Sequence, residues 1–195
     1  MTQRTLSVLR TRDDRELPVA GVYTIDPHHA SVEFVARHLM ITKVRGRIAD
    51  VSGTITIADE PEQSHVEVDI GVAGLDTGDP QRDAHLRGAD FFDVETYPTI
   101  TFRSTRVEAG PSKTWTVTGD LTVRDVTRPA TLEVDFEGAS GSPAGDERIG
   151  FSAAGDVDRE DWGLTWNVAL ETGGVLVGRR ARIEINVEAV APPRP

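Results

Sequence analysis

The sequence predicts an all-β protein, an antiparallel β-barrel of about eight strands with one or two short helices at its mouth. Apolar and polar side chains alternate with a period of two through most of the chain, as in residues 64–72, where Val66, Val68 and Ile70 share one face. This pattern is typical of antiparallel sheets with one solvated side, because strands of parallel sheets are apolar on both faces. Closing the sheet into a barrel removes its exposed edges.

Strands are expected wherever this alternation runs between Gly, Pro or Asp turn signals. The same pattern recurs with Ile100 and Phe102 in one run and with Leu132, Val134 and Phe136 in another. The predicted strands, about nine in number, are residues 22–26, 31–37, 44–58, 64–72, 99–108, 114–124, 130–137, 148–157 and 179–190.

Two segments break the period of two. Residues 78–93 are predicted to form a helix or a lid, and residues 158–174 an irregular or helical crossover that contains Trp162 and Trp166. Both segments are expected to cover a mouth of the barrel.

The chain is expected to form one domain, residues 20–191, since 195 residues suit a single domain that buries its own core. Residues 1–19 are polar, charged and without a period, which predicts a poorly ordered N-terminal leader. Residues 192–195 are predicted to be a Pro-rich tail.

Composition excludes several classes of function. Cysteine is absent, which removes disulfides, thiolate nucleophiles and zinc sites that use cysteine. The net charge of -11 repels phosphate backbones and anionic membrane surfaces, so no nucleic-acid partner and no stable membrane insertion are expected. The N-terminal residues include no apolar stretch of the length that a signal peptide needs, which predicts a cytoplasmic location.

The five histidines show no ligand spacing, so no metal site and no cofactor are predicted. His28 and His29 are adjacent, and in a strand they point to opposite faces. His38 shares the inward side with Phe34 and Ala36, where a buried imidazole must find a partner. It is interpreted either as a satisfied core histidine or as a contact for the polar end of a ligand or for a lid residue.

Residues 81–93 are the densest mixture of polar and aromatic groups, which raises the question of an active site. Asp83 and His85 are two residues apart and therefore do not face each other on a helix. We interpret the segment as a capping and salt-bridge cluster in a lid that Phe91 and Phe92 anchor to the barrel. No nucleophile elbow and no phosphate loop occurs, so the chain is predicted not to be an enzyme.

Four ordered segments resemble the YceI-like family, also described as polyisoprenoid-binding proteins with a lipocalin-like barrel. Together they extend over most of residues 22–190, which makes the resemblance specific. The first segment is Tyr23-Thr24-Ile25-Asp26-Pro27 leading to His29 and Val32-Glu33-Phe34, and the second is Arg37-His38-Leu39-Met40 running to Val44-Arg45-Gly46-Arg47. The third is Arg82-Asp83-Ala84-His85-Leu86 to Asp90-Phe91-Phe92-Asp93, ending in Pro98-Thr99-Ile100-Thr101-Phe102. The fourth is Val117-Thr118-Gly119-Asp120-Leu121-Thr122 followed by Thr127-Arg128-Pro129.

The resemblance implies a lipocalin-like barrel whose apolar bore binds, carries or sequesters a polyisoprenoid or isoprenoid-quinone type lipid. It also implies a homodimer, because dimers are common in the family. It does not fix the head group, since quinones, prenyl phosphates and prenyl alcohols share the same tail. Two alternatives remain open, an enzyme that acts on an isoprenoid lipid and an interaction scaffold without a ligand.

The predicted ligand-contact residues are those that the alternation places inside the barrel, with Trp162 at the mouth. The same residues would also fill a solid core, and the sequence does not distinguish a hollow barrel from a filled one. They are Phe34, His38, Val66, Val68, Ile70, Phe102, Trp115, Leu121, Phe136 and Trp162.

Overall fold

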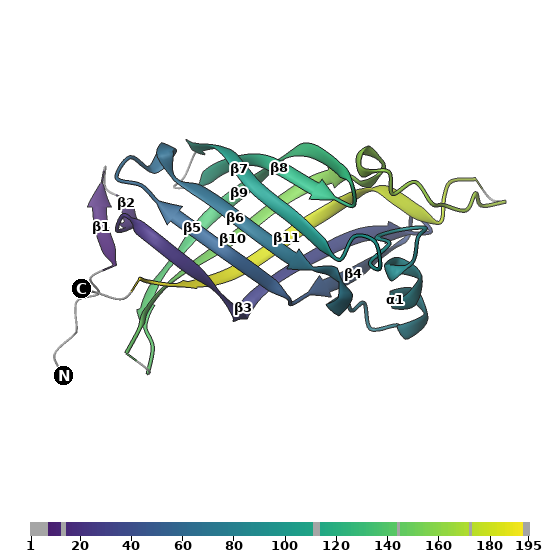
Figure 1. The fold of residues 1–195 in the computed structure, drawn as a ribbon. Coiled ribbons are helices and arrows are strands. Elements are labelled where there is room, and N and C mark those ends of the chain that lie inside the picture. Colours follow the sequence, from purple (N-terminus) through teal and green to yellow (C-terminus); the bar gives the residue numbers. More distant parts are fainter. Residues whose placement is uncertain (1–7, 13–14, 111–113, 144, 172, 193–195) are drawn as a thin grey trace.

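The computed structural model describes residues 8–12, 15–110, 114–143, 145–171 and 173–192, and in it nine strands form one antiparallel sheet (Figure 1). Two further short strands form a separate hairpin. The strands of the sheet are β3 (Gly21–His38), β4 (Thr42–Ile48), β5 (Val51–Ile57), β6 (His65–Gly71), β7 (Thr99–Ala109), β8 (Trp115–Val123), β9 (Val126–Gly141), β10 (Glu147–Asp158) and β11 (Val177–Val190).

The sheet closes because β11 pairs with β10 along one edge and with β3 along the other. Strand β4 pairs with the C-terminal half of β3, and β5 pairs with the first residues of β3. The two strands therefore share one position around the barrel. The barrel therefore has eight strand positions, which confirms the predicted antiparallel barrel. The single strand predicted over residues 44–58 is wrong, since Ala49 and Asp50 separate β4 from β5.

A large bulge accompanies this interruption. Val187 pairs with Ala30 and Ala189 pairs with Ile25, so residues 26–29 of β3 lie opposite the single residue Glu188. A bulge of this kind bends its strand. It divides β3 into a half beside β5 and a half beside β4.

The N-terminal residues 9–12 and 15–18 form a hairpin, where the sequence predicts a poorly ordered leader. Strands β1 (Leu9–Arg12) and β2 (Arg15–Pro18) pair antiparallel. Leu17 is buried against the barrel, and the Arg10 guanidinium donates to the Ala58 carbonyl oxygen at 2.6 Å. The charged side chains of this segment are therefore not only solvated, since Arg10 also contacts the barrel. Residues 1–7, 13–14 and 193–195 lie outside the described part, and the predicted limits of the domain stay a prediction.

One α-helix, α1 (Pro80–Arg87), lies at one end of the barrel (Figure 1). Its N-cap is Asp79, whose carboxylate accepts hydrogen bonds from the backbone N–H groups of Gln81 and Arg82, and Pro80 follows in the first turn. A 3₁₀ helix, Arg159–Trp162, begins the second irregular segment. Both predicted interruptions of the strand pattern are confirmed. No helix in the described part of the chain is long and apolar enough to cross a bilayer.

Candidate ligand-binding bore

A cavity of about 300 Å³ runs inside the barrel, and side chains from all nine strands of the sheet, β3 to β11, line it. Apart from Arg10, Ser64 and Arg159, every residue on its wall is apolar or aromatic. The wall reaches from Leu17 of the N-terminal hairpin to Leu86 of α1. A molecule held along this bore would therefore meet hydrocarbon on all sides.

Nine of the ten predicted contact residues lie on the wall of this bore, and His38 does not. His38 is the last residue of β3, paired with Thr42 and with Val177, and it is half-buried. Alternation gives it the inward side, but the strand ends there. Whether any of these residues contacts a ligand stays a prediction. The nine are Phe34, Val66, Val68, Ile70, Phe102, Trp115, Leu121, Phe136 and Trp162.

Two phenylalanine rings lie over glycines of the neighbouring strand. The ring of Phe34 occupies the space where a Cβ on Gly46, its register partner, would stand. The ring of Phe102 does the same over Gly119. These rings are accommodated against the wall of the barrel, which leaves the bore open. Neither glycine is distinguished by the alternation of its strand, although a Gly inside a strand pattern often marks such a close approach.

Arg159 is a buried cation on the wall of the bore, only 6% exposed. Its guanidinium donates hydrogen bonds to the backbone carbonyl oxygens of Leu164, Val177 and Gly178, and among the described residues no carboxylate forms an ion pair with it. Burial lowers the pKa of Arg159 from its ordinary value. The contacts tie the 3₁₀ helix to the start of β11. The sequence pattern does not predict this burial, because it depends on the crossover that folds over Arg159.

Arg10 is the corresponding cation from the N-terminal hairpin. Its Nε is buried and has no hydrogen-bond acceptor in the described structure, while its other nitrogens reach Ala58 and Asp59. The apolar bore thus has one guanidinium contributed by the hairpin and one by the crossover.

Asp83 and His85, the pair considered for acid-base chemistry, point to different partners. The Asp83 carboxylate accepts hydrogen bonds from the backbone N–H of Thr77, at 2.9 Å, and from its hydroxyl. The His85 ring lies 3.1 Å from Asp90 and packs edge-on against Trp166 at a centroid distance of 4.5 Å. Both act within the cap and packing of α1, in agreement with the interpretation as a lid cluster.

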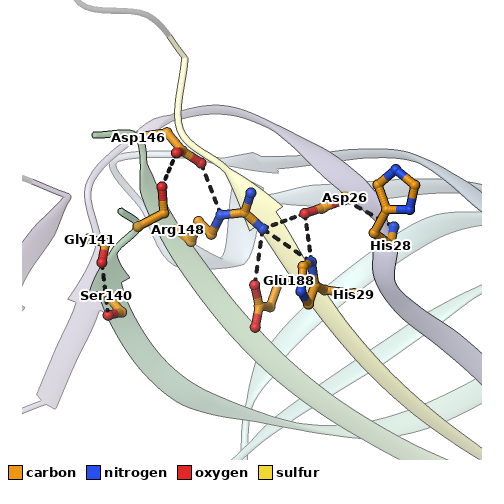
Figure 2. Close-up of polar contacts among 9 residues, drawn as sticks. Asp26, His28, His29, Ser140, Gly141, Asp146, Arg148 and Glu188 are labelled. Carbon is orange, nitrogen blue, oxygen red and sulfur yellow. Dashed lines mark hydrogen bonds and ion pairs between the residues drawn. The ribbon is translucent and has the colours of Figure 1, made fainter. Parts of the chain in front are cut away.

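A second polar cluster surrounds the bulge of β3 (Figure 2). Asp26 accepts a hydrogen bond from His29 Nδ1 at 2.8 Å and forms an ion pair with Arg148, which also contacts Asp146 and Glu188. The hydrogen bonds from His29, from the His28 backbone N–H and from Arg148 hold the pKa of Asp26 well below its usual range. The Asp26 carboxylate in turn raises the pKa of Arg148.

Ligand atoms of Asp26, His29 and Glu188 lie within 4.8 Å of one another, a geometry that could hold a metal ion. However, the Arg148 guanidinium lies among them, 3.3 Å from His29 Nδ1 and 3.2 Å from Glu188. Its positive charge already neutralises the carboxylates and would repel a cation. We therefore assign the cluster as ion pairs that join β3, β10 and β11. Sequence spacing did not predict it, because Arg148 and Glu188 lie far along the chain from Asp26.

Comparison with known proteins gives matches along most of the chain. The family model described as YceI-like domain matches residues 23–189. A UPF0312 protein of Pseudomonas putida is 38% identical over 175 residues, which cover 88% of this chain and 88% of the relative.

Among solved structures, BcnA of Burkholderia cenocepacia has a TM-score of 0.70 and 22% identity, covering 85% of this chain and 99% of that one. A polyisoprenoid binding domain from Saccharophagus degradans has a TM-score of 0.61 and 18% identity, covering 87% of this chain and 98% of that one. These two structures share the fold of this chain.

Proposed function

Since the chain belongs to the YceI-like domain family, we propose that it binds an elongated apolar lipid, of polyisoprenoid or isoprenoid-quinone type, and carries or sequesters it in the bore. The continuous apolar bore is the observation that carries this proposal. A solved relative of the same fold is a polyisoprenoid binding domain, which supports the choice of lipid class.

The size and chemistry of the bore suit a hydrocarbon chain. Its volume of about 300 Å³ falls at the lower end of the range for small-molecule sites. Each buried methylene contributes about 0.8 kcal/mol, so two isoprene units contribute roughly 8 kcal/mol, more than the roughly 4 kcal/mol lower bound for the cost of association. Polar groups of the ligand would lie toward Arg10 or Arg159, because the remaining wall offers almost no hydrogen-bonding partner.

We propose binding without covalent chemistry. Among the described residues on the bore wall there is no histidine and no carboxylate, and the hydroxyl of Ser64 is hydrogen-bonded to the backbone N–H of Ala58. A general acid or base must reach the reacting atom directly or through one water. The cytoplasmic location and the homodimer stay predictions, which fractionation and sedimentation velocity would check.

Native mass spectrometry of the purified protein, followed by organic extraction, tests the proposal. We expect an extra mass that is lost on extraction, and a thermal midpoint that rises when prenyl alcohols of increasing length are added back.

Val68→Trp should plug the bore, so we expect a folded protein with little lipid. An unfolded Val68→Trp protein, together with wild type that holds no lipid and does not respond to prenyl alcohols, would establish a solid-cored scaffold. Chemical turnover of the added alcohol would establish an enzyme.

A further inference from the structure

Exposed apolar side chains gather at one end of the barrel. Five large apolar side chains are exposed in the described part of the chain, and four of them, Leu39, Met40, Ile41 and Val168, lie on two neighbouring loops. The loops are the β3–β4 turn and residues 163–171 with 173–176, which project from the barrel at the end where α1 lies (Figure 1). We call these four residues the apolar tip.

The two loops form one surface. The backbone N–H of Leu39 donates a hydrogen bond to the carbonyl oxygen of Leu176 at 2.8 Å. The side chain of Met40 lies beside Gly174. Ile41 is the most exposed member, at 77%. A single flat partner could therefore contact both loops at once.

The turn at the apolar tip has a backbone conformation that its residues disfavour. Leu39 and Met40 have φ values of 51° and 60°, and the Ile41 N–H donates to the His38 carbonyl oxygen to close the turn. Two consecutive left-handed residues make the type I′ hairpin turn, in which Asn and Gly are favoured and large side chains are strained. In the free barrel Leu39 and Met40 therefore have a strained backbone and apolar side chains that are exposed to water. Contact with an apolar phase would remove the cost of this exposure.

Positive charge flanks the apolar tip. Residues 37–47 contain Arg37, Lys43, Arg45 and Arg47 and no carboxylate, although the whole chain has a net charge of -11. Arg45 is already paired with Glu33 and Glu184. Arg37 and Lys43 are register partners on the exposed side of the hairpin, and neither forms an ion pair in the part of the chain that the structure describes.

The local charge decides how the barrel meets a charged surface at short range. Repulsion from distant carboxylates is screened beyond about 8 Å at physiological ionic strength. Glu171 is the only carboxylate in residues 163–176, so within the two loops of the apolar tip Arg37 and Lys43 outnumber the carboxylates. Apolar side chains flanked by cations are the pattern of proteins that lie on anionic bilayers.

We propose that the apolar tip docks the barrel reversibly on the surface of a bilayer that contains anionic lipids, with Arg37 and Lys43 against the headgroups. Only the purpose of docking, which is to bring the bore to its lipid, rests on the proposed lipid-binding function. Val177, which lines the bore, pairs with His38 directly before the turn, so docking brings the end of the bore to the bilayer. Four side chains provide reversible contact rather than stable insertion.

Flotation with phosphatidylcholine vesicles, with and without a third of phosphatidylglycerol, tests this surface. We expect wild type to float with the anionic vesicles more than with the neutral ones. The variant Leu39→Asn/Met40→Gly installs the residues that a type I′ turn prefers, so its thermal midpoint should be equal or higher while binding falls at least about tenfold. Arg37→Glu/Lys43→Glu should lose the preference for anionic vesicles.

Val22→Ser is the matched control, because Val22 is 51% exposed but lies at the opposite end of β3, outside the apolar tip. It should float like wild type. Docking is refuted if wild type floats with neither kind of vesicle, or if Leu39→Asn/Met40→Gly floats like wild type. A dimer in sedimentation velocity that this variant abolishes, without vesicle binding, would assign the surface to a second copy of the chain.

These outcomes are separate from the lipid-binding test. Flotation is scored on protein that has first been extracted free of lipid, so docking stands or falls without a ligand in the bore. If both proposals hold, the Leu39→Asn/Met40→Gly protein retains lipid that is already bound but takes it up from vesicles more slowly than wild type. Equal uptake rates would show that docking has no part in loading.

Discussion

Phe34 and Phe102 take part in the wall of the bore through the glycines beneath their rings. At Gly46 the three atoms nearest to an added Cβ all belong to the ring of Phe34. At Gly119 it would meet the ring of Phe102 and also the backbone carbonyl oxygen of Arg103, at 2.6 Å. A ring can rotate away from such a contact, whereas a backbone carbonyl in a β-ladder cannot.

The two glycines therefore predict different effects of the same substitution. Gly46→Ala should push the Phe34 ring into the bore, with a loss of about 1–3 kcal/mol in the free energy of unfolding and a clear drop in lipid content. Gly119→Ala should destabilise more, because strand β7 must shift. Urea unfolding and lipid extraction measure both effects. Gly74→Ala is the control, since nothing lies within 4 Å of its added Cβ. Unchanged lipid content in Gly46→Ala would contradict the idea that the ring has open space to enter.

The ion pairs of Asp26 predict a dependence of stability on pH. The pKa of Asp26 is lowered in the folded protein, so its contacts stabilise the fold above the ordinary Asp pKa of about 3.9 and lose this effect as the pH falls below that value. Asp26→Asn should lower the free energy of unfolding by about 1–3 kcal/mol at neutral pH. The difference in the free energy of unfolding between wild type and Asp26→Asn should become smaller below a pH of about 4.

Urea unfolding between neutral and acidic pH measures that difference. Asp59→Asn serves as the control, because the Asp59 side chain is 92% exposed and its contact with Arg10 is 3.5 Å long, so it should change stability little. If this difference in the free energy of unfolding stayed constant at all acidic pH values measured, the ionisation of Asp26 would not be the cause of the pH dependence.

At the scale of elements, the N-terminal hairpin adds to the barrel a part that the family match does not include. The match begins at residue 23, whereas β1 and β2 end at Pro18. The hairpin contributes Arg10, Leu17 and Pro18 to the wall of the bore, and Arg12 pairs with Glu60 at 2.6 Å. It therefore covers the part of the bore farthest from α1.

Removal of residues 1–19 should leave the nine-stranded sheet folded and open this part of the bore. We expect bound lipid to pass faster to an acceptor such as cyclodextrin, because Leu17 and Pro18 no longer cover it. Arg12→Gln, which removes the ion pair with Glu60 and the hydrogen bond to the Asp59 carbonyl oxygen but keeps the hairpin, should transfer lipid at the wild-type rate. An equal rate in the truncated protein would show that the hairpin does not limit release.

At the scale of the whole molecule, closure of the sheet and the distribution of charge have separate consequences. Closure pairs β11 with β3, which joins the two ends of the ring of eight strand positions and encloses the bore. The net charge of -11 favours solubility, yet residues 37–47 are locally basic. The whole chain is thus negatively charged, whereas the sequence around the surface proposed to dock is locally basic.

The sequence by itself determined the barrel, a helix or lid within residues 78–93 and the inward side of nine residues that line the bore. Alternation suffices for these, because successive side chains of a strand point to opposite faces whatever lies around them. The Asp79-Pro80 start of α1 is equally local, since an N-cap acts on the next three residues. His38 does not line the bore, although alternation gives it the inward side, because alternation says nothing of where the bore ends.

Only the tertiary structure decided whether the bore is open and which distant groups meet. The rings of Phe34 and Phe102 lie over glycines of neighbouring strands, which depends on the register between those strands. Asp26 meets Arg148 and Glu188, and Leu39 meets Leu176, through pairings that join strands far apart in the chain. Register and closure depend on the packing of the entire sheet, and no local pattern of residues contains them.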